Sequence, residues 1–491
     1  MLYRLVERIA ANEFLRYFFS FAALFFLLVS PTSDTDLGWR LKYGEYLWQN
    51  QNLLRQDIFS WTLPQYPWFD ISWLFNLLEY LLFTQFGFIA LSFFGGLLII
   101  SCFYFVTKAF KPGLTILWIV ILLFYFYLGP MLTPGLRPQI ITLLGISLLS
   151  LLVYEVEKGN YKKALLFPLV ILAWVNLHGT FLLGLFIVFL YSLLKITELL
   201  LFRSSLDAKS LKNKIVNLSA GTILSAVVLV LQLDGPGLFG QIWQYLPTNR
   251  IEGVSEWYPI SLQSEEWLLL IVWTILSLVI VLRKRRTVFG LYKALITLAF
   301  AFFAFNSRRM FGPFFLVTLP FFLEFLQEGK IFLKGKTANI VSFILIITFI
   351  NYGFLVRFPQ SKFLNISWAD YCDLGAGCSV RAAAFLQKNP LPKKVFTYYN
   401  FGGFTIWHNP KSKIFVDGRM DQWKKDSYSP FVDHQTILYK GDLELFNKYN
   451  FDAAYLPTTL RLYFYLKRQV AEGKWEVIFE DEKAAIFVRK R

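Results

Sequence analysis

Long apolar runs recur along the whole chain and restrict it to one class of fold. The chain has 491 residues, of which 56% are hydrophobic, 19% aromatic and 17% charged, and its mean hydropathy is +0.48. A soluble domain of this length cannot bury so many apolar side chains, so the composition predicts a polytopic membrane protein. We count about eleven spans, allowing for short ones that tilt or thin the bilayer. They are Leu15–Ser30, Gly87–Thr107, Leu114–Leu128, Pro138–Tyr154, Ala164–Leu177, Thr180–Leu201, Ile215–Leu233, Trp267–Leu282, Val288–Phe305, Met310–Leu326 and Ala338–Phe354.

Positive charge gives the expected topology. The net charge is +16, which in so apolar a chain indicates cytoplasmic loops and contact with anionic lipid, not nucleic-acid binding. With the N-terminus inside, lysine and arginine collect in alternate loops, whereas the opposite loops carry little besides Arg137, Arg250 and the pair Arg308-Arg309. Pro31 follows the first run and no small-residue cleavage site is evident, so we expect a retained anchor. The C-terminal part should then lie outside the cytoplasm.

The chain divides into two predicted domains. Residues 1–356 form the membrane domain, which includes a first outer loop at 31–86, and residues 357–491 form an extracytoplasmic domain. The tail mixes strand-like and helix-like runs, which predicts an α/β or α+β fold. The strand-like runs are Lys394–Tyr399, Lys413–Asp417, Trp475–Phe479 and Ala484–Val488, and the helix-like runs are Val380–Gln387 and Arg461–Val470. Cys372 and Cys378 either form a small disulfide loop in this tail or remain free thiols.

The first outer loop carries the most informative polar motif. Asp34 and Asp36 lie one residue apart where the first span meets the loop. Two such carboxylates repel each other unless a metal ion, a cation or an acceptor hydroxyl uses them, and the alternative is that both are solvated loop residues. The residues that follow predict an amphipathic helix over Leu37–Gln49 and a short apolar helix over Ile71–Phe86. The second helix is too short to cross comfortably, so we expect it to lie in the membrane interface.

This order of parts resembles the GT-C superfamily of integral-membrane glycosyltransferases, which use polyprenyl-phosphate-linked sugars. The closer resemblance is to a widespread group of uncharacterised bacterial multi-pass membrane proteins, and it covers nearly the whole chain. The shared segments are Asp34-Thr35-Asp36-Leu37-Gly38-Trp39, Asp57-Ile58-Phe59-Ser60-Trp61-Thr62, Trp68-Phe69-Asp70-Ile71-Ser72-Trp73-Leu74-Phe75, Arg137-Pro138-Gln139, Asn176-Leu177-His178-Gly179, Ser255-Glu256-Trp257 and Val416-Asp417-Gly418-Arg419. The resemblance implies that Asp34 and Asp36 act as a catalytic base or bind a divalent metal such as Mg2+ or Mn2+, and both schemes stay open.

Basic residues on the outer side are candidates for the donor phosphate. Arg308 and Arg309 are adjacent cations placed against the topology rule, and their forked guanidinium groups suit a phosphate or pyrophosphate. Arg137 has a similar outer position, and His178 at a span end could bind phosphate or donate a proton near neutral pH. The alternatives are span-end capping, contact with anionic lipid, and a structural histidine.

Further residues are candidates for the acceptor or the sugar. Asp57 and Asp70 lie in the first outer loop, and Glu256 lies in a later outer loop. Trp39 and Trp73 offer faces on which sugar rings stack, although tryptophan also anchors interfacial helices, and Asp is common in turns.

We therefore expect an inverting transfer of a sugar from a polyprenyl-phosphate donor to a glycan, lipid or protein hydroxyl on the extracytoplasmic face. The alternative is a non-catalytic lipid-sugar transporter or an envelope assembly scaffold. A transporter needs polar residues in mid-membrane, and the predicted spans lack them almost entirely. A protein-directed transferase, with a tail that binds peptide, is a further variant.

Overall fold

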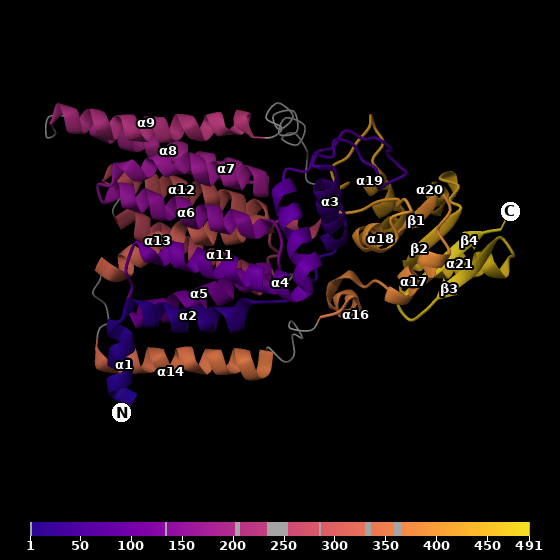
Figure 1. Cartoon of the computed structure of the whole chain (residues 1–491), viewed down its shortest axis with the longest axis horizontal. Coiled ribbons are helices and arrows are strands. Elements are labelled where there is room, and N and C mark those ends of the chain that lie inside the picture. The colour runs from indigo at the N-terminus through magenta and orange to yellow at the C-terminus, as the bar shows by residue number, and fades with distance from the viewer. Residues whose placement is uncertain are drawn as a thin grey trace. The chain divides into compact units, whose positions relative to one another are not determined.

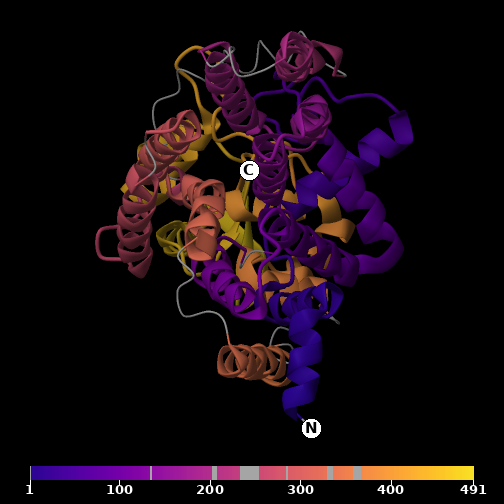
Figure 2. The ribbon, with the colours of Figure 1, turned by 90° about the vertical axis from the view of Figure 1, so that its left-hand side faces the viewer.

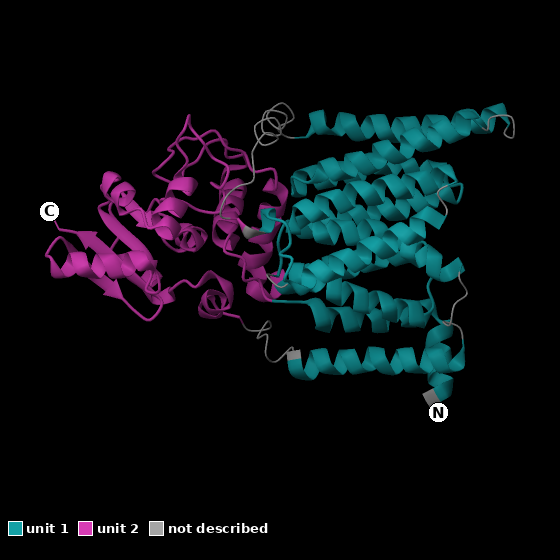
Figure 3. Ribbon diagram, turned by 180° about the vertical axis from the view of Figure 1, so that it is seen from behind, with its two compact units in different colours: residues 1–30, 92–238, 255–362 teal, residues 31–91, 239–254, 363–491 magenta. Residues whose placement is uncertain are grey.

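The computed structural model describes residues 2–132, 135–201, 207–232, 254–283, 286–328, 335–357 and 366–490. They form two compact units, which Figure 3 distinguishes by colour. The first unit comprises residues 1–30, 92–238 and 255–362, and the second comprises residues 31–91, 239–254 and 363–491. This division differs from the predicted boundary at 356/357, because the first outer loop groups with the C-terminal part of the chain.

The first unit is a bundle of helices (Figure 1). Its helices are α1 (Leu2–Ala11), α2 (Glu13–Leu28), the later part of α4 (Trp73–Lys108), α5 (Leu114–Leu132), α6 (Gln139–Glu157), α7 (Phe167–Leu177), α8 (Phe181–Leu201), α9 (Ala208–Leu231), α11 (Glu265–Arg283), α12 (Val288–Asn306), α13 (Phe311–Glu328) and α14 (Lys336–Tyr352). Short turns join some of them: η1 (Tyr161–Leu166), η3 (Ser255–Trp257), η4 (Arg308–Met310) and η5 (Gly353–Arg357). Helix α1 turns by 101° into α2 and packs against α2 and α14 (Figure 2).

The described part of the chain contains nine helices that are long and apolar enough to cross a membrane, or ten if α1 and α2 count as one bent span. Each predicted span overlaps a described helix, and α7, with 11 residues, is the shortest of these. The structure is therefore mostly helical and consistent with a polytopic helical protein, whereas the count of about eleven crossings stays a prediction.

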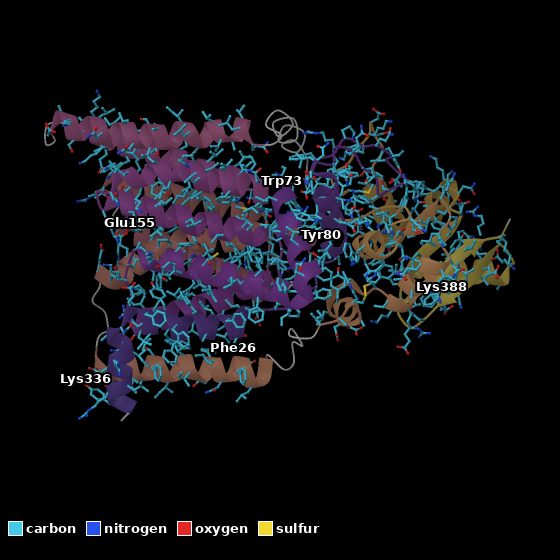
Figure 4. All side chains as sticks on the ribbon, in the orientation of Figure 1. Phe26, Trp73, Tyr80, Glu155, Lys336 and Lys388 are labelled. Atoms are coloured by element: carbon cyan, nitrogen blue, oxygen red, sulfur yellow. A yellow bond between two sulfur atoms is a disulfide. The ribbon has the colours of Figure 1, made fainter. Side chains whose placement is uncertain are left out.

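Aromatic and small side chains bring the helices of this unit together. The rings of Tyr127 and Phe315 stack with centroids 4.8 Å apart, and Phe26 of α2, labelled in Figure 4, meets Phe354 at 5.5 Å. Gly145 in α6 admits the ring of Trp174, because a Cβ there would lie 2.2 Å from a ring carbon. Close approach at small residues is the usual way in which membrane helices pack.

The second unit combines short helices with one small sheet. Its helices and turns are α3 (Leu37–Asn50), the first part of α4, α16 (Trp368–Tyr371), η6 (Cys372–Ala376), α17 (Val380–Lys388), η7 (Tyr399–Phe401), α18 (Gly402–His408), α19 (Pro430–Gln435), η8 (Thr436–Lys440), α20 (Leu443–Lys448) and α21 (Arg461–Ala471). The strands are β1 (Val395–Thr397), β2 (Ala453–Pro457), β3 (Trp475–Glu480) and β4 (Ala484–Arg489), in the order β1-β2-β4-β3. Strand β1 pairs parallel to β2, and the other pairs are antiparallel.

The predicted α/β character of the tail is confirmed, with two differences. Three of the four predicted strands and both predicted helices are present, but the run 413–417 is not a strand, and β2 was not predicted. Ile414 instead makes an isolated parallel bridge with Ser60 of the first outer loop. Strand β2 begins with two alanines, which are poor strand formers, so burial in the sheet centre and not local propensity determines its conformation.

Backbone pairing explains why the first outer loop belongs to this unit. The Trp61 N–H donates to the Ile414 carbonyl at 3.1 Å, and the Ile414 N–H donates to Phe59 O at 3.1 Å. The Trp61 indole N–H donates to Val395 O at 3.0 Å. Residues of the loop and of the C-terminal segment also share one hydrophobic core. The loop therefore completes the fold of the C-terminal domain.

Helix α4 is broken at Gly87, where φ is 68°, a left-handed conformation that favours glycine. The break confirms a short helix before Gly87 followed by a longer apolar one, and Figure 4 labels Trp73 and Tyr80 on the short part. Its position in the membrane interface stays a prediction. Cys372 and Cys378 form a disulfide, whereas Cys102 is a buried free thiol.

Candidate active site

The acidic motif lies at the entrance to α3, in the second unit. Asp36 is the N-cap residue of α3, but its side chain makes no capping hydrogen bond. The Leu37 N–H donates to Asp34 O at 3.1 Å, and the Tyr371 hydroxyl donates to the same carbonyl oxygen at 2.7 Å. This tight turn gives the two carboxylates different surroundings, since Asp34 is buried and Asp36 is only half-buried.

Asp34 forms part of a buried ion cluster. Arg40 donates through Nη1 to Asp34 Oδ2 and through Nε to Glu79 Oε2, the latter at 2.8 Å. The three residues are 6%, 2% and 1% exposed in the order Asp34, Arg40, Glu79. Burial raises the pKa of Glu79, and the Arg40 guanidinium partly opposes that rise. One arginine therefore serves two carboxylates, and the charge of Asp34 is already compensated inside the protein.

The sequence interpretation missed Arg40 and Glu79. Arg40 appeared as one of several polar residues on an amphipathic helix, which normally face water. Glu79 carried a usable signal, because it is the single charged residue of the apolar segment 71–86. An isolated acid in such a segment needs a buried cationic partner.

Asp36 faces a different part of the second unit. A Cβ at Gly418 would lie 1.8 Å from Asp36 Oδ1, so the carboxylate rests directly against the backbone of Gly418. Tyr399 lies nearby, and its pKa is raised well above the ordinary value, first by burial and then by the negative charges of Asp36 and Asp421. The phenol is therefore neutral, and a hydroxyl near an acid is suited to hydrogen bonding with a substrate.

Close glycine contacts assemble this site from three chain segments. A Cβ at Gly403 would lie 2.5 Å from Thr35 O, and one at Gly402 would lie 2.6 Å from Asp417 Cβ. The acidic motif, the 399–403 segment and the 417–419 turn thus meet at backbone distance. The sequence interpretation named the acidic motif and the 417–419 turn but did not bring them together.

Asp57 and Arg419 form a second buried ion cluster. Arg419 donates to Asp57 Oδ1 at 2.7 Å and to Asp417 Oδ2 at 2.5 Å, and its side chain is 0% exposed. Its guanidinium also lies about 5 Å from the ring centres of Trp68 and Trp423. Burial alone would raise the pKa of Asp57, but the charge of Arg419 and the Ser60 hydroxyl lower it below the ordinary value. These contacts indicate a structural role for Asp57, not an acceptor-binding one.

The other acceptor candidates of the first outer loop also contribute to packing. Trp39 is 8% exposed within the shared core, and Trp73 packs against that core. Asp70 accepts hydrogen bonds from the Ser72 N–H at 3.0 Å and from the Asn76 side chain. Burial raises the pKa of Asp70, and these two hydrogen bonds partly oppose the rise. These contacts are typical of an Asp in a turn at the start of a helix, which is the alternative that the sequence analysis left open for Asp70.

The arginines for which the sequence predicts an outer position gather in the first unit, at the ends of the helices. Arg137 donates to Glu256 Oε1 at 2.6 Å, and Arg309 Nε lies 3.6 Å from Glu256 Oε2. Arg308 donates to Glu266 Oε1 at 2.5 Å. The structure thus brings together Arg137, Arg308, Arg309 and Glu256, and it adds Glu266, which the sequence interpretation did not single out. We call these five residues the arginine cluster.

Two adjoining cavities surround the arginine cluster. The larger has a volume of about 910 Å³ and the smaller about 200 Å³, and both are lined by Pro130, Glu266 and Arg308. The larger also has an apolar wall that includes Leu27, Phe126 and Leu269. Charged groups beside an apolar wall suit an amphiphile whose headgroup is anionic.

His178 lies near this cluster but is not a cation. Its Nδ1 is 2.9 Å from the hydroxyls of both Thr142 and Thr180. Burial, together with the positive charges of Arg309 and Arg137, lowers the pKa of His178 to about 3. The imidazole is therefore neutral near pH 7, which favours a structural role over proton donation.

The described side chains around Asp34 and Asp36 do not form a suitable site for a divalent cation. Arg40 already occupies Asp34 Oδ2, and a metal bound there would face a guanidinium at short range in a buried setting. Within the described ranges, no group of three or more His, Cys, Asp and Glu side chains is arranged to hold a metal ion. We therefore derive no step through Mg2+ or Mn2+.

Comparisons with protein-family models and with curated proteins find no match to this chain. The acidic site and the arginine cluster belong to different compact units.

Proposed function

We propose that the chain is a GT-C-like glycosyltransferase of a bacterial inner membrane, which moves a sugar from a polyprenyl-phosphate donor to a glycan, lipid or protein hydroxyl outside the cytoplasm. The observation that carries the proposal is the arginine cluster beside an apolar-walled cavity of about 910 Å³. A polyprenyl-phosphate sugar has the same two parts, an anionic phosphate and a long apolar chain.

We assign donor binding to the first unit. The guanidinium groups of Arg308 and Arg309 suit the phosphate, because each offers several N–H donors in a fixed plane. The apolar wall formed by Leu27, Phe126 and Leu269 takes the start of the isoprenoid chain. During transfer the phosphate leaves with the electron pair of the broken bond, and nearby cations stabilise that charge.

We assign proton abstraction to Asp36 in the second unit. The acceptor oxygen forms a bond to the anomeric carbon, the bond from that carbon to the phosphate oxygen breaks, and the acceptor proton passes to the carboxylate. Attack opposite the leaving phosphate inverts the anomeric configuration. Asp34 is a poorer candidate because Arg40 already uses its charge. We therefore give Asp34 and Arg40 the role of holding the entrance to α3 in position.

The first experiment asks whether the protein carries the donor lipid. The full chain is purified in nanodiscs, and its lipids are analysed by mass spectrometry for wild type, for Arg308→Ala/Arg309→Ala and for Arg283→Ala. Arg283 ends α11, the helix that begins with Glu265 and Glu266, so the control removes an arginine far from the arginine cluster. A polyprenyl-phosphate lipid that is lost only from the double variant supports the proposal. Its absence from every sample contradicts the donor assignment.

A lipid-sugar transporter or an assembly scaffold is the alternative function. The described helices do contain buried or half-buried charges, such as Lys293, which donates to Glu324, and Lys195, which donates to Glu157. These are compensated pairs near helix ends, whereas a transport path needs polar groups along the spans. A bound donor lipid combined with normal cellular function of Asp36→Asn would favour this alternative.

A further inference from the structure

The arginine cluster has a defined charge that bears on which lipid phosphate it accepts. Among the described residues, the smaller cavity is lined by Arg137, Arg308 and Arg309 and by Glu256 and Glu266, which leaves one net positive charge. A sugar linked through one phosphate is a phosphodiester with one negative charge, whereas a sugar linked through a diphosphate carries two. The charge of the cluster therefore matches the phosphodiester.

We propose that the arginine cluster selects a lipid phosphodiester over a lipid diphosphate, and that Glu256 and Glu266 impose this selection. The inference rests on the proposed function, because it specifies the donor class for the same site. Specificity of this kind comes from groups that repel the wrong ligand as much as from groups that attract the right one.

Glu256 is held at the centre of the cluster and cannot simply turn away. Its carboxylate contacts Arg137 at 2.6 Å and Arg309 at 3.6 Å. Its carbonyl oxygen accepts a hydrogen bond from the Ser307 hydroxyl at 3.2 Å. The next residue, Trp257, lies under the Arg309 guanidinium, with 5.0 Å between that group and the ring centre. The backbone of Glu256 and the side chain of Arg309 are thus both held in place. The Glu256 carboxylate therefore remains among the guanidinium groups when a ligand enters.

Glu266 has the same effect on Arg308. The two side chains contact each other at 2.5 Å, and Glu266 is only 17% exposed. The Arg308 N–H donates to Tyr258 O at 2.9 Å, which fixes the turn that carries the arginine. A second phosphate in this cavity would lie beside Glu256, which is 34% exposed, or beside Glu266, and like charges at such short range repel each other.

The shape of the site agrees with the charge. The smaller cavity measures about 200 Å³, below the roughly 300–1,000 Å³ of pockets that enclose a whole small-molecule ligand. It therefore suits a headgroup fragment, while the apolar wall of the larger cavity takes the chain. The two cavities share Arg308, so a phosphate there lies at the junction between polar and apolar walls.

The test measures binding without any sugar transfer. The probes are a polyprenyl methyl phosphodiester and the matching polyprenyl methyl diphosphate, with the same chain, added to the full-length protein in nanodiscs. Dissociation constants are compared for wild type, Glu256→Gln, Glu266→Gln and the control Glu13→Gln. Glu13 is an exposed acid at the start of α2 and lines neither cavity, so its variant removes an equal charge outside the proposed site.

We expect wild type to bind the phosphodiester at least tenfold more tightly than the diphosphate. Glu256→Gln and Glu266→Gln should each reduce that ratio several-fold by improving diphosphate binding, and Glu13→Gln should leave it unchanged. Glutamine keeps the size and one acceptor oxygen, and size-exclusion profiles check that the variants fold.

Two outcomes overturn the inference in different ways. If wild type binds the diphosphate as tightly as the phosphodiester, or if neither glutamine variant changes the ratio, the selection is wrong while the donor site stands. If wild type binds neither probe, the donor assignment of the proposed function fails as well.

Discussion

Gly38 in α3 lies against Gly403 in α18 so closely that a Cβ atom at Gly38 would be 2.1 Å from the Gly403 carbonyl oxygen. The two residues are far apart in sequence, and this contact joins the helix that follows the acidic motif to the C-terminal segment. The position of Asp36 therefore depends on a backbone crossing that only a residue without a side chain permits. The proposed chemistry and the fold of the second unit meet at this crossing.

Gly38→Ala should destabilise the second unit. Alanine gains about 0.5–1 kcal/mol in helix propensity over glycine, but overpacking at a close contact costs about 1–3 kcal/mol. The added methyl group meets a backbone carbonyl, which cannot move as a flexible side chain would. The midpoint of thermal unfolding in detergent should fall for this variant and stay unchanged for Gly113→Ala, since Gly113 has no atom within 4 Å of its Cβ position. Equal midpoints for both variants would show that the crossing is not tight.

Asp57→Asn should destabilise the protein above pH 4 and matter less in acid. Breaking a buried ion pair costs about 3–5 kcal/mol, and Asp57 and Arg419 are both fully buried. Because the folded pKa of Asp57 is lowered, its contribution is complete above its unfolded pKa and is lost as the pH falls through the folded value. Stability of the two proteins should therefore converge as the pH falls below about 4, near the reference value of Asp. A constant difference at every pH would contradict this assignment.

Asp36→Asn and Asp34→Asn should separate chemistry from stability. Loss of a general base typically lowers the rate about 100- to 10,000-fold, so Asp36→Asn should lose transfer activity and keep its unfolding midpoint. Asp34→Asn leaves Arg40 with one carboxylate partner, so the unfolding midpoint of this variant should fall. Gly418→Ala displaces the Asp36 carboxylate without removing its charge and should also slow transfer. The control Glu444→Gln removes the charge of an exposed acid of α20. Full activity of Asp36→Asn would refute the role of Asp36 as the general base.

The sequence predicts the helical elements well and the contacts of the site poorly. Apolar runs such as 114–128 give a helix because nearly every residue favours burial in lipid, whatever lies beside it. The Gly87 break was also readable, since glycine separates a short run from a long one. Nothing local, however, indicates that Ile414 pairs with Ser60, or that Gly403 approaches Gly38. Such long-range contacts depend on three-dimensional complementarity, so Asp57 and Trp39 appeared as candidates for binding although they belong to a core.

Acid should destabilise the protein through its histidines. All three have pKa values lowered by burial, although His408 is only half-buried, and the pKa of His434 is lowered to about 3. His434 Nε2 accepts the Tyr399 N–H at 3.1 Å, so the folded state requires the neutral ring. A depressed histidine pKa makes stability fall as the pH drops from about 6.5 toward the folded value, by up to about 1.4 kcal/mol per pH unit for each residue. His434→Gln keeps an acceptor but does not titrate, so its midpoint should depend less on pH between 6.5 and 4. The same slope as wild type would contradict this account.

The disulfide offers a test of topology that is independent of enzymatic activity. If the second unit faces an oxidising compartment, Cys372 and Cys378 should be bonded in living cells, whereas a cytoplasmic location would keep them reduced. Thiols are blocked with an alkylating reagent at lysis, and peptide mass spectrometry then counts free and bonded cysteines. We expect Cys372 and Cys378 to resist alkylation until reductant is added, and the buried Cys102 to react only after denaturation.

The same bond should also contribute to stability. A disulfide that closes a loop of this size, with a sequence separation of 6, removes about 2 kcal/mol of unfolded-chain entropy. Reductant should therefore lower the unfolding midpoint of wild type, while Cys372→Ser/Cys378→Ser should start at the lower midpoint and not respond. Free thiols at both positions in cells would place the second unit in a reducing compartment. They would thereby contradict the proposal that transfer occurs outside the cytoplasm, whatever the lipid-binding experiments show.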